Sequence, residues 1–130
     1  MSTKMFIPIK PIGKGRPRFT RTGHAYTPEK TREYERMLCL AYEGECYSGK
    51  IEVAITAYYE PPKSLSQKKR EALVGQMYDK KPDIDNIAKA VLDALNGKAF
   101  TDDKNIVKLT VEKLYYGFDA LAVEIKEIEK

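Results

Sequence analysis

Five aspartates in one stretch of sequence are the residues of this chain best suited to chemistry. They lie within residues 83–103, together with two lysines. Carboxylate oxygens are the ligands that hard cations such as Mg²⁺ prefer, and two or three suffice when water and a phosphate complete the coordination. A bound divalent ion neutralises a phosphodiester and generates hydroxide near neutral pH. One interpretation of the pattern is therefore a metal site at Asp83, Asp85 and Asp103, whose carboxylates would otherwise repel one another.

A lysine accompanies these acids at helical spacing. If residues 84–96 form a helix, Lys89 follows Asp85 by one turn and Asp93 follows Lys89 by another. The three side chains would then share one side of the helix. An ammonium group there can donate to phosphoryl oxygens as charge builds up in the transition state. Alternatively, Lys89 simply pairs with the Asp85 carboxylate.

Each aspartate also has an explanation that involves no chemistry. Asp83 is well placed to cap the helix, and the helix dipole favours an acid at position 85. Asp102 and Asp103 suit a turn. Each explanation is sufficient for its own residue, but together they require several independent coincidences. Spacing alone leaves both interpretations open and does not name a substrate.

Charge is unevenly distributed along the chain. Residues 1–28 contain six lysines and arginines and no aspartate or glutamate, although the net charge of the whole chain is only +4. A basic arm beside an acidic cluster suits a protein that grips a polyanion and holds a cation against it. A solvated basic face that only aids solubility explains the same charges. The single histidine, His24, lies in this arm, and we expect it at the surface or against DNA because it has no partner for metal binding.

Alternation of hydrophobic and polar residues predicts four strands. Residues 4–9 form the first, and Pro8 implies that it lies at a sheet edge. Residues 51–59 alternate throughout, which is typical of a half-buried strand. Residues 107–111 and 121–125 alternate on either side of a turn, and we expect them to pair as a hairpin.

Three helices are expected between these strands. The first opens at Thr27–Pro28, where a capping threonine precedes proline, and stops near Gly44. The second covers Ser64–Gln76 and begins with a capping box. The third spans about 84–96, because its apolar residues form one stripe and Asn96–Gly97 is a common stop.

These elements predict a single α+β domain over residues 1–130, with residues 1–28 including the basic arm. We expect a mixed or antiparallel sheet of about four strands with about three helices packed on it. The strand after the third helix should pack beside that helix and return Asp103 toward Asp83. No apolar run is long enough for a membrane span or a signal peptide, so a cytoplasmic protein with reduced cysteines is expected.

One stretch of the sequence carries a recognisable motif. Residues 81–89 read K-P-D-I-D-N-I-A-K, D-A-L follows at 93–95, and the acidic pair Asp102-Asp103 precedes a strand. This pattern resembles the RusA family of Holliday-junction resolvases. The similarity is dense over residues 80–113 and looser in the basic arm. D-x-D-N alone would say little, but with the lysine, D-A-L and the spaced acidic pair the motif is fairly specific.

The resemblance implies an endonuclease that uses Mg²⁺ or Mn²⁺. Its metal ligands and essential acids would be Asp83, Asp85 and Asp103. Lys89 would be the catalytic lysine, oriented by Asp93, and Asp102 would support the neighbouring acid. Family members act as homodimers that nick opposing strands of four-way branched DNA symmetrically, and a two-fold dimer matches a two-fold substrate. The resemblance gives no reason to expect a membrane or small-molecule partner.

Clustered basic residues are expected to contact DNA phosphates, which position the protein without reading sequence. The candidates are Lys14, Arg16, Arg18, Arg21, Lys80 and Lys81. Lys113 would either reach the site or remain solvated. Two alternatives stay open: a nuclease for other branched or flapped DNA, and a non-catalytic DNA-binding protein, which would tolerate Asp85→Asn.

Overall fold

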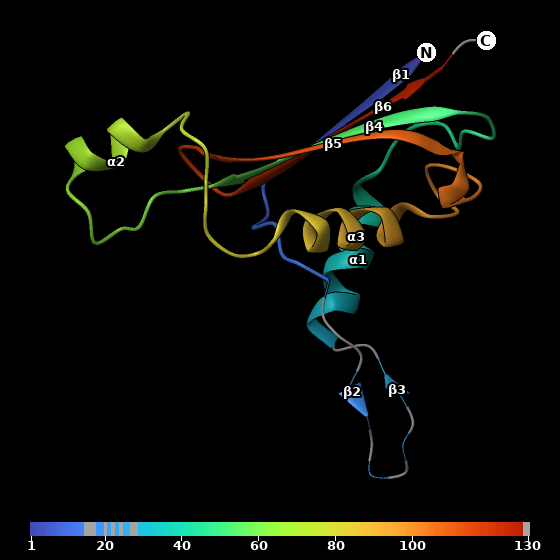
Figure 1. Cartoon of the computed structure of the whole chain (residues 1–130), viewed down its shortest axis with the longest axis horizontal. Coiled ribbons are helices and arrows are strands. Elements are labelled where there is room, and N and C mark those ends of the chain that lie inside the picture. The colour runs from blue at the N-terminus through green and yellow to red at the C-terminus, as the bar shows by residue number, and fades with distance from the viewer. Residues whose placement is uncertain (15–17, 20, 22, 24, 27–28, 129–130) are drawn as a thin grey trace.

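A four-stranded mixed sheet forms the body of the protein (Figure 1). The structure is a computed structural model that describes residues 1–14, 18–19, 21, 23, 25–26 and 29–128. The strand order is β1-β6-β4-β5, in which β4 and β5 are parallel and the other neighbours are antiparallel. The strands are β1 (Ser2–Ile7), β4 (Ile51–Tyr59), β5 (Ile106–Tyr115) and β6 (Ala120–Glu127). With three α-helices, this confirms the α+β class, and β1 is an edge strand as Pro8 implied.

Strand β4 lies at the centre of the sheet because it pairs on both sides. Its residues alternate between buried and half-buried along its whole length, as the sequence pattern predicted. It pairs with β5 on one side and with β6 on the other. The predicted hairpin between residues 107–111 and 121–125 is therefore wrong. Alternation identifies a strand and its buried face, but it does not identify the neighbouring strand.

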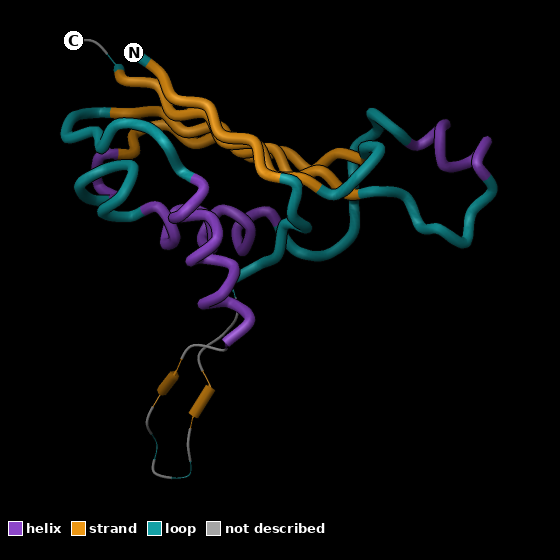
Figure 2. The backbone as a smooth tube through the Cα atoms, turned by 180° about the vertical axis from the view of Figure 1, so that it is seen from behind, coloured by secondary structure: helices purple, strands orange, loops and turns teal. Residues whose placement is uncertain are grey.

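Two helices cover one face of the sheet, and Figure 2 shows the same layers from behind. They are α1 (Glu29–Ala41) and α3 (Ile84–Leu95), and both contribute fully buried side chains to the core. Helix α3 buries Ile87, Val91 and Leu95, as its apolar stripe predicted. Ile84 was expected in the same stripe, but its side chain is 46% exposed.

The remaining elements extend away from this body (Figure 1). Helix α2 (Gln67–Leu73) buries no side chain, and its N-cap is Ser66, which accepts the backbone N–H of Lys69 at 3.3 Å. The predicted start at Ser64 is therefore two residues too early. In the basic arm, β2 (Arg18–Phe19) pairs with β3 (Ala25–Tyr26). In the part of the chain that the structure describes, no helix is long and apolar enough to cross a membrane.

Strand β5 runs back along α3 and so determines where the candidate residues lie. The chain leaves α3 through Gly97, whose φ of 83° favours glycine, and β5 begins at Ile106. Near the other end of β5, the Lys113 ammonium donates to the carbonyl of Pro82, just before α3 begins, at 2.9 Å. The strand does pack beside the helix, but this places residues 102–106 at the C-terminal end of α3.

Candidate metal and DNA site

Two exposed carboxylates mark the start of α3. Asp83 occupies the N-cap position, yet its side chain makes no capping hydrogen bond. The Asp85 carboxylate accepts the backbone N–H of Asn86 at 3.0 Å. The capping explanation therefore does not account for Asp83, whose carboxylate is exposed to solvent. Carboxylates at a helix N-terminus are also stabilised by the helix dipole.

Lys89 lies one turn further along α3 and pairs with Asp93. Its ammonium is 3.7 Å from the Asp93 carboxylate, and the orienting role that the resemblance implied for Asp93 stays a prediction. No pair between Lys89 and Asp85 is formed. The Lys89 side chain is 63% exposed, so its ammonium is accessible from solvent.

Lys14 is also held by Asp93. Its ammonium lies 2.7 Å from Glu35 on α1 and 3.2 Å from Asp93 on α3. Burial acts to lower the pKa of Lys14, but the hydrogen bonds to Glu35 and Asp93 outweigh it and raise the pKa. Lys14 was expected to contact DNA; in this structure its charge links the basic arm to both helices.

A second acidic group lies in the turn after α3. The short 3₁₀ helix η1 (Asp103–Asn105) begins there, and the Asp102 carboxylate accepts the backbone N–H of Lys104 at 3.3 Å. A hydrogen bond between the two carboxyl groups lowers the pKa of Asp102, which the Lys104 N–H lowers further. The same hydrogen bond raises the pKa of Asp103. The pKa values of these two neighbouring acids are therefore shifted in opposite directions.

The two acidic groups lie at opposite ends of α3. Helix α3 has twelve residues, which makes it about 18 Å long. Asp103 lies near enough to Asp93, in the last turns of the helix, for their charges to interact. Among the described residues, no three histidine, cysteine, aspartate or glutamate side chains are grouped to hold a metal ion. The carboxylates suit Mg²⁺ chemically, but the convergence expected within one chain is wrong.

Lys113 is a positioning residue whose role the sequence left open. Its ammonium donates to the carbonyl oxygens of Lys80 at 2.6 Å and Pro82 at 2.9 Å. It therefore fixes the segment that leads into Asp83. The signal in the sequence was that Lys113 continues the alternation of Val107, Leu109 and Val111, at a position where an apolar residue is expected. In the structure it lies opposite the buried Ala57 on β4.

The candidate DNA contacts are only partly within the described residues. Lys80 and Lys81 are exposed beside Asp83, and Arg21 is exposed in the arm. Arg16 and His24 lie outside the described residues, and only the backbone of Arg18 is described, in β2. Their predicted contacts with DNA stay predictions.

Comparison with known proteins places the chain in a family. Residues 8–126 match the family described as endodeoxyribonuclease RusA. The chain is also similar to the uncharacterized protein YqaN of Bacillus subtilis strain 168, with 32% identity over 130 aligned positions that cover 92% of each chain. The match includes both acidic groups, Lys89 and the basic segment before α3. The chain therefore belongs to the RusA endodeoxyribonuclease family.

Proposed function

We propose that this protein is a divalent-metal-dependent endonuclease that resolves Holliday junctions by paired, symmetric nicking of four-way DNA. The observation that carries the proposal is that the carboxylates of Asp83 and Asp85 are exposed at the start of α3, in a chain that belongs to the RusA family. Asp83 makes no capping bond, and Lys89 reaches toward solvent one turn away from Asp85. All of these side chains are exposed, so a metal ion or DNA can reach them.

The proposed roles follow from the chemistry of the side chains. Asp83, Asp85 and Asp103 would hold Mg²⁺ or Mn²⁺, which when bound supplies an activated water and neutralises the phosphate. Lys89 would donate to the phosphoryl oxygens of the cut strand. Asp93 holds the Lys89 ammonium, and Asp102, which accepts the backbone N–H of Lys104, would support Asp103. Flanking phosphates would be held by the exposed Arg21, Lys80 and Lys81 and by the other basic residues of the arm.

A homodimer would bring the separated acids together. Across a two-fold axis, two α3 helices that face each other in opposite directions place the start of each near the end of its partner. Asp83 and Asp85 of one copy could then meet Asp103 of the other. Exposed hydrophobic side chains beside this face support self-association. They are Ile84 on α3 and Val107 and Leu109 on β5, an edge strand.

The test uses a supercoiled plasmid that carries a cruciform, which is a four-way junction. With Mg²⁺, the wild-type protein should convert the plasmid to linear DNA through two nicks in one binding event, and a chelator should stop the reaction. Asp85→Asn should abolish cutting and leave junction binding intact, because it removes a metal ligand and one negative charge. The matched control is Asp79→Asn, which neutralises an exposed aspartate outside the proposed site.

The outcomes separate this proposal from its alternatives. Equal cutting by wild type and Asp85→Asn would remove the metal-site assignment. Binding of junctions without cutting under any divalent ion would indicate a non-catalytic DNA-binding protein. Faster cutting of flapped or three-way DNA than of four-way DNA would retain the nuclease but change its substrate.

A further inference from the structure

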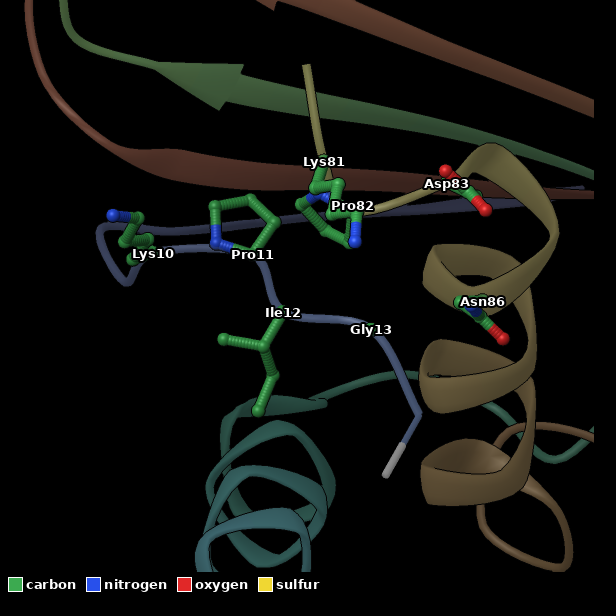
Figure 3. A pocket seen from close by; sticks show the side chains of 8 residues that line it. All are labelled: Lys10, Pro11, Ile12, Gly13, Lys81, Pro82, Asp83 and Asn86. Carbon is green, nitrogen blue, oxygen red and sulfur yellow. The ribbon is translucent and has the colours of Figure 1, made fainter. Parts of the chain in front are cut away.

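A preformed pocket adjoins the proposed metal site. It has a volume of about 480 Å³ and lies between the segment 10–13 and the segment that leads into α3 (Figure 3). That volume is within the range of pockets that hold small ligands. Its rim includes Asp83, so any molecule in the pocket lies beside the reacting centre that we propose.

Both walls of the pocket are fixed by the fold. On one side, the buried Tyr59 hydroxyl donates to the Pro11 carbonyl at 2.8 Å, and the Lys14 N–H donates to the Asn86 carbonyl at 3.0 Å. At Gly13 a Cβ would lie only 3.0 Å from the Asn86 Cβ, so the two walls approach closely there. On the other side, Lys113 holds the carbonyls of residues 80 and 82. The pocket is therefore preorganised, and little conformational entropy is lost in its walls when a ligand binds.

The lining combines three kinds of surface. Ile12 and Pro82 are half-buried and supply apolar walls against which a ring or sugar can pack. Lys10 and Lys81 are exposed and form no salt bridge within the described part of the chain. Asn86 is exposed and offers both a donor and an acceptor. The two lysines outnumber the one carboxylate of the lining, Asp83, and together with the apolar wall and the amide they suit an anion that carries a planar polar ring.

We propose that this pocket receives one unstacked nucleotide of the substrate strand, next to the phosphate that is cut. Lys10 and Lys81 bind its phosphates, Ile12 and Pro82 pack against its ring and sugar, and Asn86 bonds to the edge of its base. Nucleotides at a branch point require the least free energy to unstack, because base stacking is already interrupted on one side of them. This inference rests on the proposed function, since it takes the substrate to be branched DNA.

The experiment places the fluorescent base 2-aminopurine, in turn, at each nucleotide flanking the mapped cut site of a four-way junction. Stacking quenches this base, and the lining of the pocket contains no aromatic ring. Saturating wild-type protein without metal should raise the fluorescence several-fold at one position. Lys10→Ala and Asn86→Ala should remove most of that rise while the junction remains bound. Lys4→Ala is the control, because it removes an exposed lysine from the sheet edge outside the pocket.

Cleavage rates give a second reading. Junctions that differ only in the base at the brightened position should be cut at different rates by the wild type, and Asn86→Ala should reduce those differences by roughly tenfold. If no position brightens, or if both pocket variants behave as Lys4→Ala does, the pocket proposal is overturned while junction cutting with Mg²⁺ still supports the nuclease. If the wild type neither binds nor cuts junctions, the proposed function and this inference both fail.

Discussion

At the scale of single residues, Lys89 allows chemistry to be separated from stability. Its ion pair with Asp93 spans 3.7 Å and is largely exposed, and such pairs contribute roughly 0.5 kcal/mol or less to folding. We predict that Lys89→Ala leaves the melting temperature nearly unchanged but slows junction cutting by about 100-fold, because a donor to the developing charge is lost. Binding of uncut junction should hardly change. Initial cutting rates and gel-shift titrations measure the two effects.

The matched control is Lys108→Ala. Lys108 also forms a 3.7 Å ion pair, with Glu52, and its side chain is 69% exposed. It pairs with Glu52, which alternates with the buried residues of β4, so it lies on the face of the sheet away from the helices. If both variants slow cutting equally, the loss of rate comes from removing a positive charge anywhere on the protein. Lys89 would then lose its assignment as the catalytic lysine.

Lys14 gives a prediction about stability and pH. Its pKa is raised above the usual value near 10.5 by Glu35 and Asp93, so the ion pairs stabilise the fold fully below the pKa of the unfolded chain and lose that effect as pH rises through the folded pKa. We predict that Lys14→Met lowers the free energy of unfolding by about 1–2 kcal/mol near neutral pH. The difference from wild type should stay constant from about pH 7 to 9 and shrink above about pH 10.5. Urea unfolding at each pH measures it, and an unchanged difference at high pH would contradict the assignment.

At the scale of elements, the wall of the pocket depends on one buried hydrogen bond from β4. The Tyr59 hydroxyl donates to the Pro11 carbonyl, and burial raises the pKa of Tyr59. We predict that Tyr59→Phe lowers the free energy of unfolding by about 1–2 kcal/mol, because the carbonyl loses its donor in a buried place. Tyr116→Phe, at an exposed position, should cost almost nothing. Equal effects of the two changes would mean that the wall is held by packing alone.

Helices and strands could be predicted from this sequence more completely than the way in which they pair and pack. Strand β4 and helix α3 have long, regular patterns, and both were placed within a residue or two of their observed bounds. The pairing of β5 with β4 was missed because alternation carries no information about which strand lies alongside. The start of α2 was misplaced because two serines near it are both capable caps. Local chemistry thus identifies elements, whereas topology depends on contacts far apart in sequence.

The candidate site shows the same limit at longer range. Spacing identified the acids and the lysine, and the structure leaves all of them exposed. The spacing did not show that β5, by running back along α3, separates Asp103 from Asp83 within one chain. Nor did it show that Asp93 serves both Lys14 and Lys89. Those relations depend on how α1, α3 and β5 pack together, which the spacing of acids along one segment cannot express.

At the scale of the whole molecule, the acids are separated within one chain, so the proposed metal site requires two copies of the protein. If each site takes Asp83 and Asp85 from one copy and Asp103 from the other, a chain that lacks Asp83 and a chain that lacks Asp103 can complement each other. A mixed dimer then contains one site with both lesions and one site with none. If each site lies within a single chain, every site in the mixed dimer carries one lesion.

We therefore predict that Asp83→Asn and Asp103→Asn proteins are each inactive but regain cutting when co-expressed with different tags and purified as a mixed dimer. The mixed dimer should nick the cruciform plasmid to the open circle without making linear DNA, because only one of its two sites is intact. A mixed dimer of Asp83→Asn and Asp85→Asn is the control: both residues lie at the start of α3, so both of its sites keep a lesion. Open circles from the first pair alone require a site shared between copies, whereas no cutting by either mixed dimer would contradict the proposal that Asp83 and Asp103 of different copies form one site.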